Sequence, residues 1–282
     1  SCAVNKNLPA KFLLIDQNND FEKGQVLDLC DSLMFSPNSR VESASFEDKK
    51  ISEADIFVIT AGAAQKPGET RIGLIEKNIS ILKSIHSQIK NIKSSAIIIL
   101  VSNPVDILTQ VASEIFDLPI GQVFGTGTLL DTARLRWRLA RKFDRNPSNI
   151  HGYVLGEHGD SEFIAWSTVT NEFNFSENEK IALASKVKNA AYEIIAKKGS
   201  TYFGIGAATT EILQSVLWNS GKIFPVSAPL TGQYGIDDIA ISVPAKIGKN
   251  GVEKIIEISL TEKELEQLQK SAKTLKGIYN KK

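Results

Sequence analysis

The amino-acid sequence predicts an α/β protein in which a doubly wound parallel sheet is followed by a mixed α+β domain. In the first half, short apolar runs alternate with segments of helical periodicity. This alternation is typical of parallel strands that helices cover on both faces. Small and polar residues follow each run directly, at the place where such sheets bind their ligands. Together these observations indicate a sheet of the Rossmann type.

Three apolar runs of strand length define the predicted sheet. They are residues 11–16 (KFLLID), 55–60 (DIFVIT) and 94–101 (SSAIIILV). Their apolar residues are continuous rather than alternating, as expected of strands that are buried on both faces. The residues expected beyond the carboxyl ends of these strands are Asp16, Gly62, Gln65 and Asn103.

The segments between the runs have the spacing of helix faces. Apolar residues at Val26, Leu27, Leu29 and Leu33 suit one helix, and residues 73–90 repeat the same periodicity. These helices supply the crossovers that parallel strands require.

The second half predicts a different domain. Strand-like segments at 150–155 and 164–169 precede a long amphipathic stretch at 176–198, which Ser176 opens with a capping box and Gly199 follows. The remaining predicted elements are helices at 207–220 and 261–276, and strands at 238–243 and 253–258 joined by a KNG turn. We place the boundary between the domains 1–130 and 131–282.

Composition excludes several classes of function. The formal net charge of +1 over 282 residues does not suit a nucleic-acid binder. The longest apolar run, 96–101, is far too short to span a membrane. The two cysteines, Cys2 and Cys30, form neither a disulfide framework nor a metal cluster, so we expect no metal site. With no signal peptide at the start of the sequence, reduced thiols favour a cytoplasmic protein.

One of only three histidines stands in an unusual setting. His158 lies in VLGEHGDSE (154–162), between two glycines and several acids. A side chain that titrates near neutral pH on such a turn is a candidate proton carrier, and the alternative is a loop histidine that faces water. We expect His86, in a helical segment, to be structural or exposed.

Five motifs in order carry a resemblance to a known family. They are TAGAAQKPGETR (60–71), VSNPVD (101–106), GTGTLLDTARLR (125–136), GEHGD (156–160) and FPVS (224–227). With these motifs the chain resembles the bacterial L-lactate dehydrogenases over essentially its whole length. The resemblance implies reversible, NADH-dependent reduction of pyruvate to L-lactate. Two alternatives stay open: a malate or other 2-hydroxy-acid dehydrogenase, and a catalytically silent member with a binding or structural role.

The resemblance implies a role for each residue that a 2-oxo acid reductase needs. His158 matches the general acid/base, and Asp131 matches the carboxylate that holds this histidine and raises its pKa. Arg134 matches the arginine fork that binds the substrate carboxylate, and Arg71 the arginine that polarises the carbonyl. Any single arginine is more commonly a surface charge. The substrate-binding residues that the resemblance implies are Gln65, Arg71, Asn103, Asp131, Arg134 and Thr201.

Substrate choice is expected to depend on Gln65, in the loop of residues 60–71. In the related malate dehydrogenases an arginine takes this position and pairs with the second carboxylate of oxaloacetate. A neutral amide would leave that charge unpaired in a closing pocket, which favours pyruvate. The alternative is a solvated loop glutamine.

The cofactor implied by the resemblance is NAD. An acid at the end of a strand accepts hydrogen bonds from ribose hydroxyls and repels a 2′-phosphate, so Asp16 favours NAD over NADP, although a turn aspartate is the alternative. The predicted cofactor-binding residues are Asp16, Gly62, Ala63, Ser84, Val101, Ser102, Asn103 and Thr126.

The family's first strand and glycine-rich phosphate turn have no counterpart in this sequence. The family also has more residues just after Ala3 and after Asn171. A phosphate site needs that glycine loop, so we expect the first strand and the glycine loop to lie upstream of Ser1, and the further residues after Ala3 and Asn171 to be disordered parts of the same longer chain that this sequence omits. The alternative is a truncated protein without activity.

An effector site is the last expectation that the resemblance carries. Arg136 and His151 match the positions that bind fructose 1,6-bisphosphate between subunits of allosteric bacterial lactate dehydrogenases, and the implied assembly is a homotetramer, a dimer of dimers. The alternative is that both residues persist without tight binding.

Overall fold

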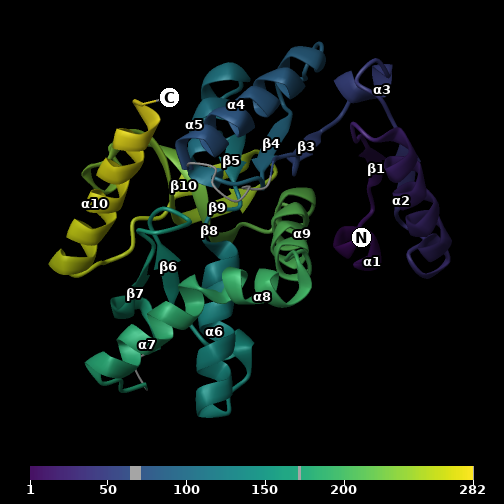
Figure 1. The fold of residues 1–282 in the computed structure, drawn as a ribbon. Helices are drawn as coiled ribbons and strands as arrows, with labels where there is room; N and C mark the ends of the chain where they lie inside the picture. The colour runs from purple at the N-terminus through teal and green to yellow at the C-terminus, as the bar shows by residue number, and fades with distance from the viewer. Residues whose placement is uncertain (64–70, 171–172, 282) are drawn as a thin grey trace.

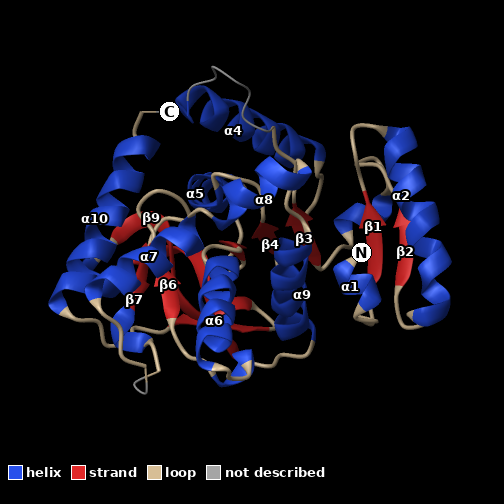
Figure 2. Ribbon diagram, turned by 60° about the horizontal axis from the view of Figure 1, so that its bottom comes forward, coloured by secondary structure: helices blue, strands red, loops and turns tan. Residues whose placement is uncertain are grey.

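The computed structural model describes residues 1–63, 71–170 and 173–281, and for Arg71 the backbone alone. Its centre is a six-stranded sheet with the strand order β10-β9-β8-β5-β4-β3 (Figure 2). Three strands of this sheet are parallel: β3 (Ile56–Ile59), β4 (Ile97–Leu100) and β5 (Val123–Gly125). Three antiparallel strands extend it from β5: β8 (Lys222–Thr231), β9 (Asp237–Gly248) and β10 (Gly251–Ile255). The sheet thus contains strands from both halves of the chain.

The strand β4 explains the continuous apolar run in the sequence. Ile98 and Leu100 pack into one core together with residues of α4 (Arg71–Gln88), α5 (Val105–Ile115) and α10 (Glu262–Tyr279). Ile97 and Ile99 pack into a second core on the other face, against α9 (Phe203–Leu217). Because both faces are covered, neither face tolerates a polar residue, as the sequence predicted.

The parallel strands are divided between two sheets. A separate pair, β1 (Lys11–Leu14) and β2 (Arg40–Ser43), is parallel and lies beside α2 (Asn19–Asp31), away from the central sheet (Figure 1). Among the described strands β3 pairs with β4 alone and forms an edge, where Val58 is 37% exposed. The helix α1 (Cys2–Asn5) packs on α9 and α3 (Lys49–Ser52) precedes β3. The α/β class with parallel strands covered by helices is confirmed, and the described parallel strands are divided between the β1–β2 pair and the central sheet.

A third core holds the elements that carry the candidate proton donor. The helix α6 (Leu129–Phe143) packs against the hairpin of β6 (Tyr153–Leu155) and β7 (Phe163–Ala165), and α7 (Glu177–Lys188) closes this core. The predicted capping box at Ser176 is confirmed. The long stretch that it opens is broken at Asn189, so that α8 (Ala190–Lys198) is a separate helix.

Short 3₁₀ turns complete the fold at Ser32–Phe35, Pro147–Asn149, Trp166–Thr168 and Gln233–Gly235. Both cysteines are free thiols. Of the helices in the described ranges, none combines the length and apolarity needed to cross a membrane.

Candidate active site

His158 lies in the loop between β6 and β7, and the backbone of this loop is tied to the central sheet. Gly156 and Ser242 of β9 exchange two backbone hydrogen bonds of 3.1 and 3.2 Å. Gly156 has a φ of +97°, and a Cβ there would lie 3.0 Å from the Ser271 hydroxyl and 3.1 Å from the Ser161 carbonyl. The position therefore requires glycine, and the resulting turn directs His158 towards α6.

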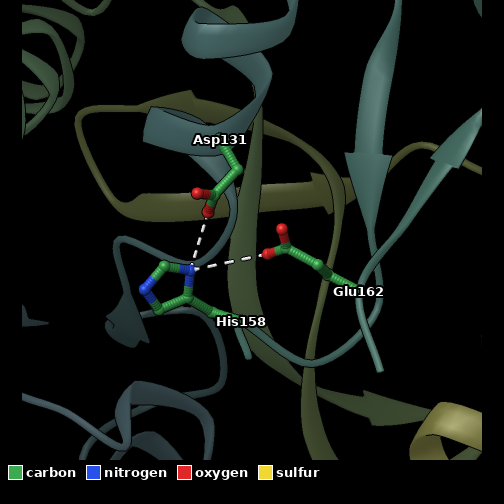
Figure 3. Close-up of side chains that lie close together, drawn as sticks. All are labelled: Asp131, His158 and Glu162. Atoms are coloured by element: carbon green, nitrogen blue, oxygen red, sulfur yellow. Dashed lines mark hydrogen bonds and ion pairs between the residues drawn. The ribbon is translucent and has the colours of Figure 1, made fainter. Parts of the chain in front are cut away.

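The carboxylate of Asp131 joins the predicted proton donor to the predicted substrate clamp (Figure 3). Its Oδ2 lies 2.7 Å from Nδ1 of His158, and its Oδ1 accepts a 2.8 Å hydrogen bond from Nη1 of Arg134. Asp131 is in the first turn of α6, and Arg134 is one turn further along the same helix, so their side chains are neighbours. The structure thus brings together Asp131, Arg134 and His158 as the sequence predicted.

Burial and charge act in opposite directions on the Asp131–His158 pair. Burial disfavours the imidazolium, but the Asp131 carboxylate outweighs this effect and raises the pKa of His158 to about 9. Burial also disfavours the carboxylate of Asp131, which is 2% exposed, yet His158 and Arg134 together lower its pKa. Near neutral pH the pair is therefore an ion pair with a proton available on the imidazole.

Asp106 holds the backbone of His158 by a hydrogen bond, a role that the sequence did not predict. This residue is 2% exposed on α5, and its Oδ2 accepts a 2.7 Å hydrogen bond from the backbone N–H of His158. Burial raises its pKa to about 6. The motif VSNPVD contains Asp106, but no feature of the sequence indicates that it reaches a residue 52 positions away.

Glu162 is a second residue that the sequence analysis did not select. Its side chain is 6% exposed, and Oε2 lies 4.0 Å from Nδ1 of His158 (Figure 3). Burial and the neighbouring Asp131 charge raise its pKa to about 8. One ligand atom from each of Asp131, His158 and Glu162 lies within 4.8 Å of the others, a spacing that could hold a cation. Here the direct hydrogen bond between Asp131 and His158 favours proton transfer instead.

The predicted cofactor residues of the central sheet gather at the carboxyl ends of β3, β4 and β5. The hydroxyl of Ser102 donates to the Ala61 carbonyl at 2.6 Å, and the backbone N–H of Thr126 donates to the carbonyl of Leu100 at 2.8 Å. A Cβ at Gly62 would lie 3.3 Å from the Cβ of Ser102, a tight contact that a side chain could make only if Ser102 shifted slightly.

Asn78 of α4 links these strand ends, and the sequence analysis missed it. Its Oδ1 accepts from the Ala63 N–H at 2.7 Å, and its Nδ2 donates to the Asn103 carbonyl at 2.8 Å. Val101 is half-buried and the Asn103 side chain is exposed, directly before a cis peptide bond to Pro104. The small Gly62–Ala63 corner and the exposed Asn103 amide lie at the carboxyl ends of the strands, where sheets of this type bind their ligands.

Other predicted residues lie apart from this edge or outside the described structure. Asp16 is exposed after β1, in the separate two-stranded sheet, and its Oδ1 accepts from the backbone N–H of Asn18 at 2.8 Å. Ser84 is exposed on α4, and Thr201 is half-buried between α8 and α9. Gln65 and the side chain of Arg71 lie outside the described residues.

The two predicted effector residues are linked through the backbone of Gly152. Nε of Arg136 donates to the carbonyl of Gly152 at 3.1 Å, and its guanidinium lies 5.2 Å from the centre of the Tyr153 ring. His151 precedes Gly152, is exposed, and donates its backbone N–H to the Thr170 hydroxyl at 3.0 Å. Arg136 therefore bonds to the residue that directly follows the exposed His151 in the chain.

A dinucleotide-type sheet edge next to a buried Asp–His pair and an arginine defines a nicotinamide-dependent dehydrogenase. The comparisons with known proteins give the family. Residues 2–125 match the NAD-binding domain of lactate/malate dehydrogenases, and residues 128–282 match their C-terminal α/β domain. This chain therefore belongs to the lactate/malate dehydrogenase family of oxidoreductases.

Individual relatives agree with this assignment. The chain is 43% identical to an L-lactate dehydrogenase of Lactococcus lactis subsp. cremoris, over 98% of this chain and 91% of the relative. It is 40% identical to that of Thermoanaerobacterium saccharolyticum, over 94% and 89%. The crystal structure of the minor L-lactate dehydrogenase from Enterococcus mundtii in its ligands-bound form superposes with a TM-score of 0.93, at 39% identity, over 99% of this chain and 92% of that one.

Proposed function

We propose that this protein is an NAD-dependent L-lactate dehydrogenase, which reduces pyruvate to L-lactate and catalyses the reverse oxidation. The observation that carries the proposal is the buried Asp131 carboxylate, bonded to His158 on one oxygen and to Arg134 on the other. This arrangement supports the assignment of His158 as the proton donor and of Arg134 as the cation that binds the substrate carboxylate.

The proposed chemistry assigns one task to each side chain. NADH, when bound, supplies the hydride that reaches C2 of pyruvate. His158 gives the proton that the developing alkoxide needs, from Nε2, because Nδ1 faces Asp131 (Figure 3). Asp131 holds the ring orientation and stabilises the imidazolium before the transfer. Arg134 uses one N–H on Asp131 and keeps its other donors for the substrate carboxylate.

Further assignments complete the proposal. We assign Arg71 to polarisation of the substrate carbonyl and Gln65 to rejection of oxaloacetate, both from the motif that they occupy. Asn103 and Thr201 are assigned to substrate orientation, and Asp16 and Ser84 to the cofactor. The domain boundary at residue 130 and a cytoplasmic location also stay predictions.

The test measures oxidation of NADH with pyruvate and with oxaloacetate at equal concentration. We expect pyruvate to be the faster substrate, whereas faster reduction of oxaloacetate would favour a malate dehydrogenase. The matched variant His158→Gln should abolish turnover and still bind NADH, as followed by nucleotide fluorescence. A wild-type protein that binds NADH but reduces neither acid would support the catalytically silent alternative.

We further propose that fructose 1,6-bisphosphate activates the enzyme at Arg136 and His151, within a homotetramer arranged as a dimer of dimers. The neighbouring positions of these two residues support a site for phosphate groups. Titration of the bisphosphate at low pyruvate should lower the apparent KM, and the double variant Arg136→Gln/His151→Gln should lose this response. An unchanged KM in the wild type would refute the activation, and sedimentation velocity would test the tetramer.

A further inference from the structure

Glu162 approaches the candidate proton donor from a different direction than Asp131. It directly precedes β7, and the hairpin of β6 and β7 folds it back beside His158, four residues earlier in the chain. Its carboxylate points to Nδ1 of His158 at 4.0 Å, while Asp131 of α6 approaches the same nitrogen at 2.7 Å (Figure 3). Two acids from two separate elements therefore face one imidazole nitrogen.

The cationic groups near Nδ1 of His158 stabilise the carboxylate of Asp131 more strongly than that of Glu162. Arg134 of α6 bonds to Asp131 at 2.8 Å, so this acid has two cationic partners. Glu162 receives weaker support, from His158 at 4.0 Å and through the field of Lys188 on α7 and of Arg134. Asp106 of α5 adds a further acid on the backbone side of His158.

The consequence is a division of charge between the two acids. Carboxylate oxygens of Asp131 and Glu162 lie within 4.8 Å of one another, and two like charges at this distance cannot both ionise without a cost in free energy. Asp131 has the better partners and ionises first, whereas burial and the Asp131 charge raise the pKa of Glu162 to about 8. Near pH 7 Glu162 is consequently a neutral acid, and it ionises in the range in which His158 begins to lose its proton.

We propose that Glu162 is a second positioning residue for the proton donor, which acts through His158 by adding a negative charge beside Nδ1 when the pH rises above neutrality. The inference rests on the proposed function, in which His158 is the proton donor. The added charge keeps the imidazolium populated and extends pyruvate reduction to higher pH. Glu162 itself transfers no proton to the substrate.

The direct test is an NMR titration of the imidazole carbons in protein labelled with ¹³C-histidine. The chain has only three histidines, so substitution of each assigns its signal. In Glu162→Gln we expect the pKa of His158 to fall by about 1 unit or more relative to the wild type. The matched control is Asp160→Asn, because this acid lies in the same loop but its side chain is 70% exposed. We expect the control to shift His158 much less.

Kinetic pH profiles supply a readout that a merely structural role would not give. At pH 6.5 the rates of Glu162→Gln and the wild type should agree within about twofold, because the glutamine resembles the neutral acid. Above pH 8 the variant should lose kcat/KM for pyruvate at a lower pH than the wild type. Superimposable profiles, an equal loss at every pH, or an unchanged titration of His158 would overturn the proposal. If the wild type did not reduce pyruvate, the proposed function would fail, and the NMR titration would still decide the role of Glu162.

Discussion

Removal of the charge on Asp131 provides the most direct test of the catalytic pair. In Asp131→Asn the hydrogen-bonding geometry can be kept, but the carboxylate that outweighs burial is lost. His158 has a pKa of about 9 beside Asp131, against an ordinary value of 6.5. The difference of about 2.5 units corresponds to about 3 kcal/mol at ~1.36 kcal/mol per unit. Since burial lowers the pKa of an imidazolium and Glu162, 4.0 Å away, replaces the Asp131 charge only in part, the variant should titrate well below 9, towards the ordinary value.

The expected loss of activity depends on pH. At pH 7.5 nearly every His158 of the wild type carries its proton, whereas at a pKa of 6.5 only about one tenth does. We therefore expect kcat/KM for pyruvate to fall by up to ~10-fold at pH 7.5 from protonation alone, and further because an asparagine amide can hold the wrong ring tautomer. The part of the loss in kcat/KM that comes from deprotonated His158 should shrink below pH 6.

The assay is NADH oxidation at subsaturating pyruvate between pH 5.5 and 9.5, with thermal unfolding as a control for folding. Loss of the ion pair with Arg134 should raise KM equally at every pH. The test of the His158 pKa is therefore the pH at which kcat/KM begins to fall on the alkaline side of the profile. An alkaline limb that stays near pH 9 in Asp131→Asn would refute the reasoning, because His158 would then owe its charge to other groups.

Four further outcomes are expected. Arg134→Lys should raise KM for pyruvate by roughly 10- to 100-fold in steady-state assays, because a planar fork is replaced by a point charge; an unchanged KM would remove Arg134 from the substrate site. Gln65→Arg should shift the kcat/KM ratio from pyruvate towards oxaloacetate, and an unaltered ratio would contradict the specificity argument. Gly127→Ala should lower the free energy of unfolding by more than ~2 kcal/mol, since φ is +51° and a Cβ would lie 2.4 Å from the Ser227 nitrogen. Gly24→Ala, with nothing within 4 Å, should instead stabilise α2 by up to ~1 kcal/mol in the same urea titration, and equal effects at both glycines would contradict the steric reasoning.

Local patterns of the sequence predicted many elements correctly. The capping box at Ser176 and the apolar run 97–100 act through neighbouring residues, so they indicate structure without knowledge of the fold. The central strand β8 was missed, because Pro225 and Pro229 argue against a strand. It forms nonetheless, since β9 pairs with it along its length and places Pro244 opposite Pro225.

In the candidate site, too, local motifs were predictable and contacts between distant segments were not. The motifs were sufficient to select Asp131, Arg134 and His158, which the structure brings together by hydrogen bonds. Asn78 and Asp106 were not selected, because their hydrogen bonds cross 25 and 52 positions of the chain. No periodicity or short motif records a contact of this kind.

By itself, the sequence determined the types of side chain available and the local elements that carry them. An arginine three residues after an aspartate on a helix must lie beside it, whatever the remaining chain does. Only the tertiary structure decided that the β6–β7 hairpin presents His158 to that aspartate at 2.7 Å and holds Glu162 at 4.0 Å. The pKa values follow from these distances and from burial, because desolvation and charge act through space rather than along the chain.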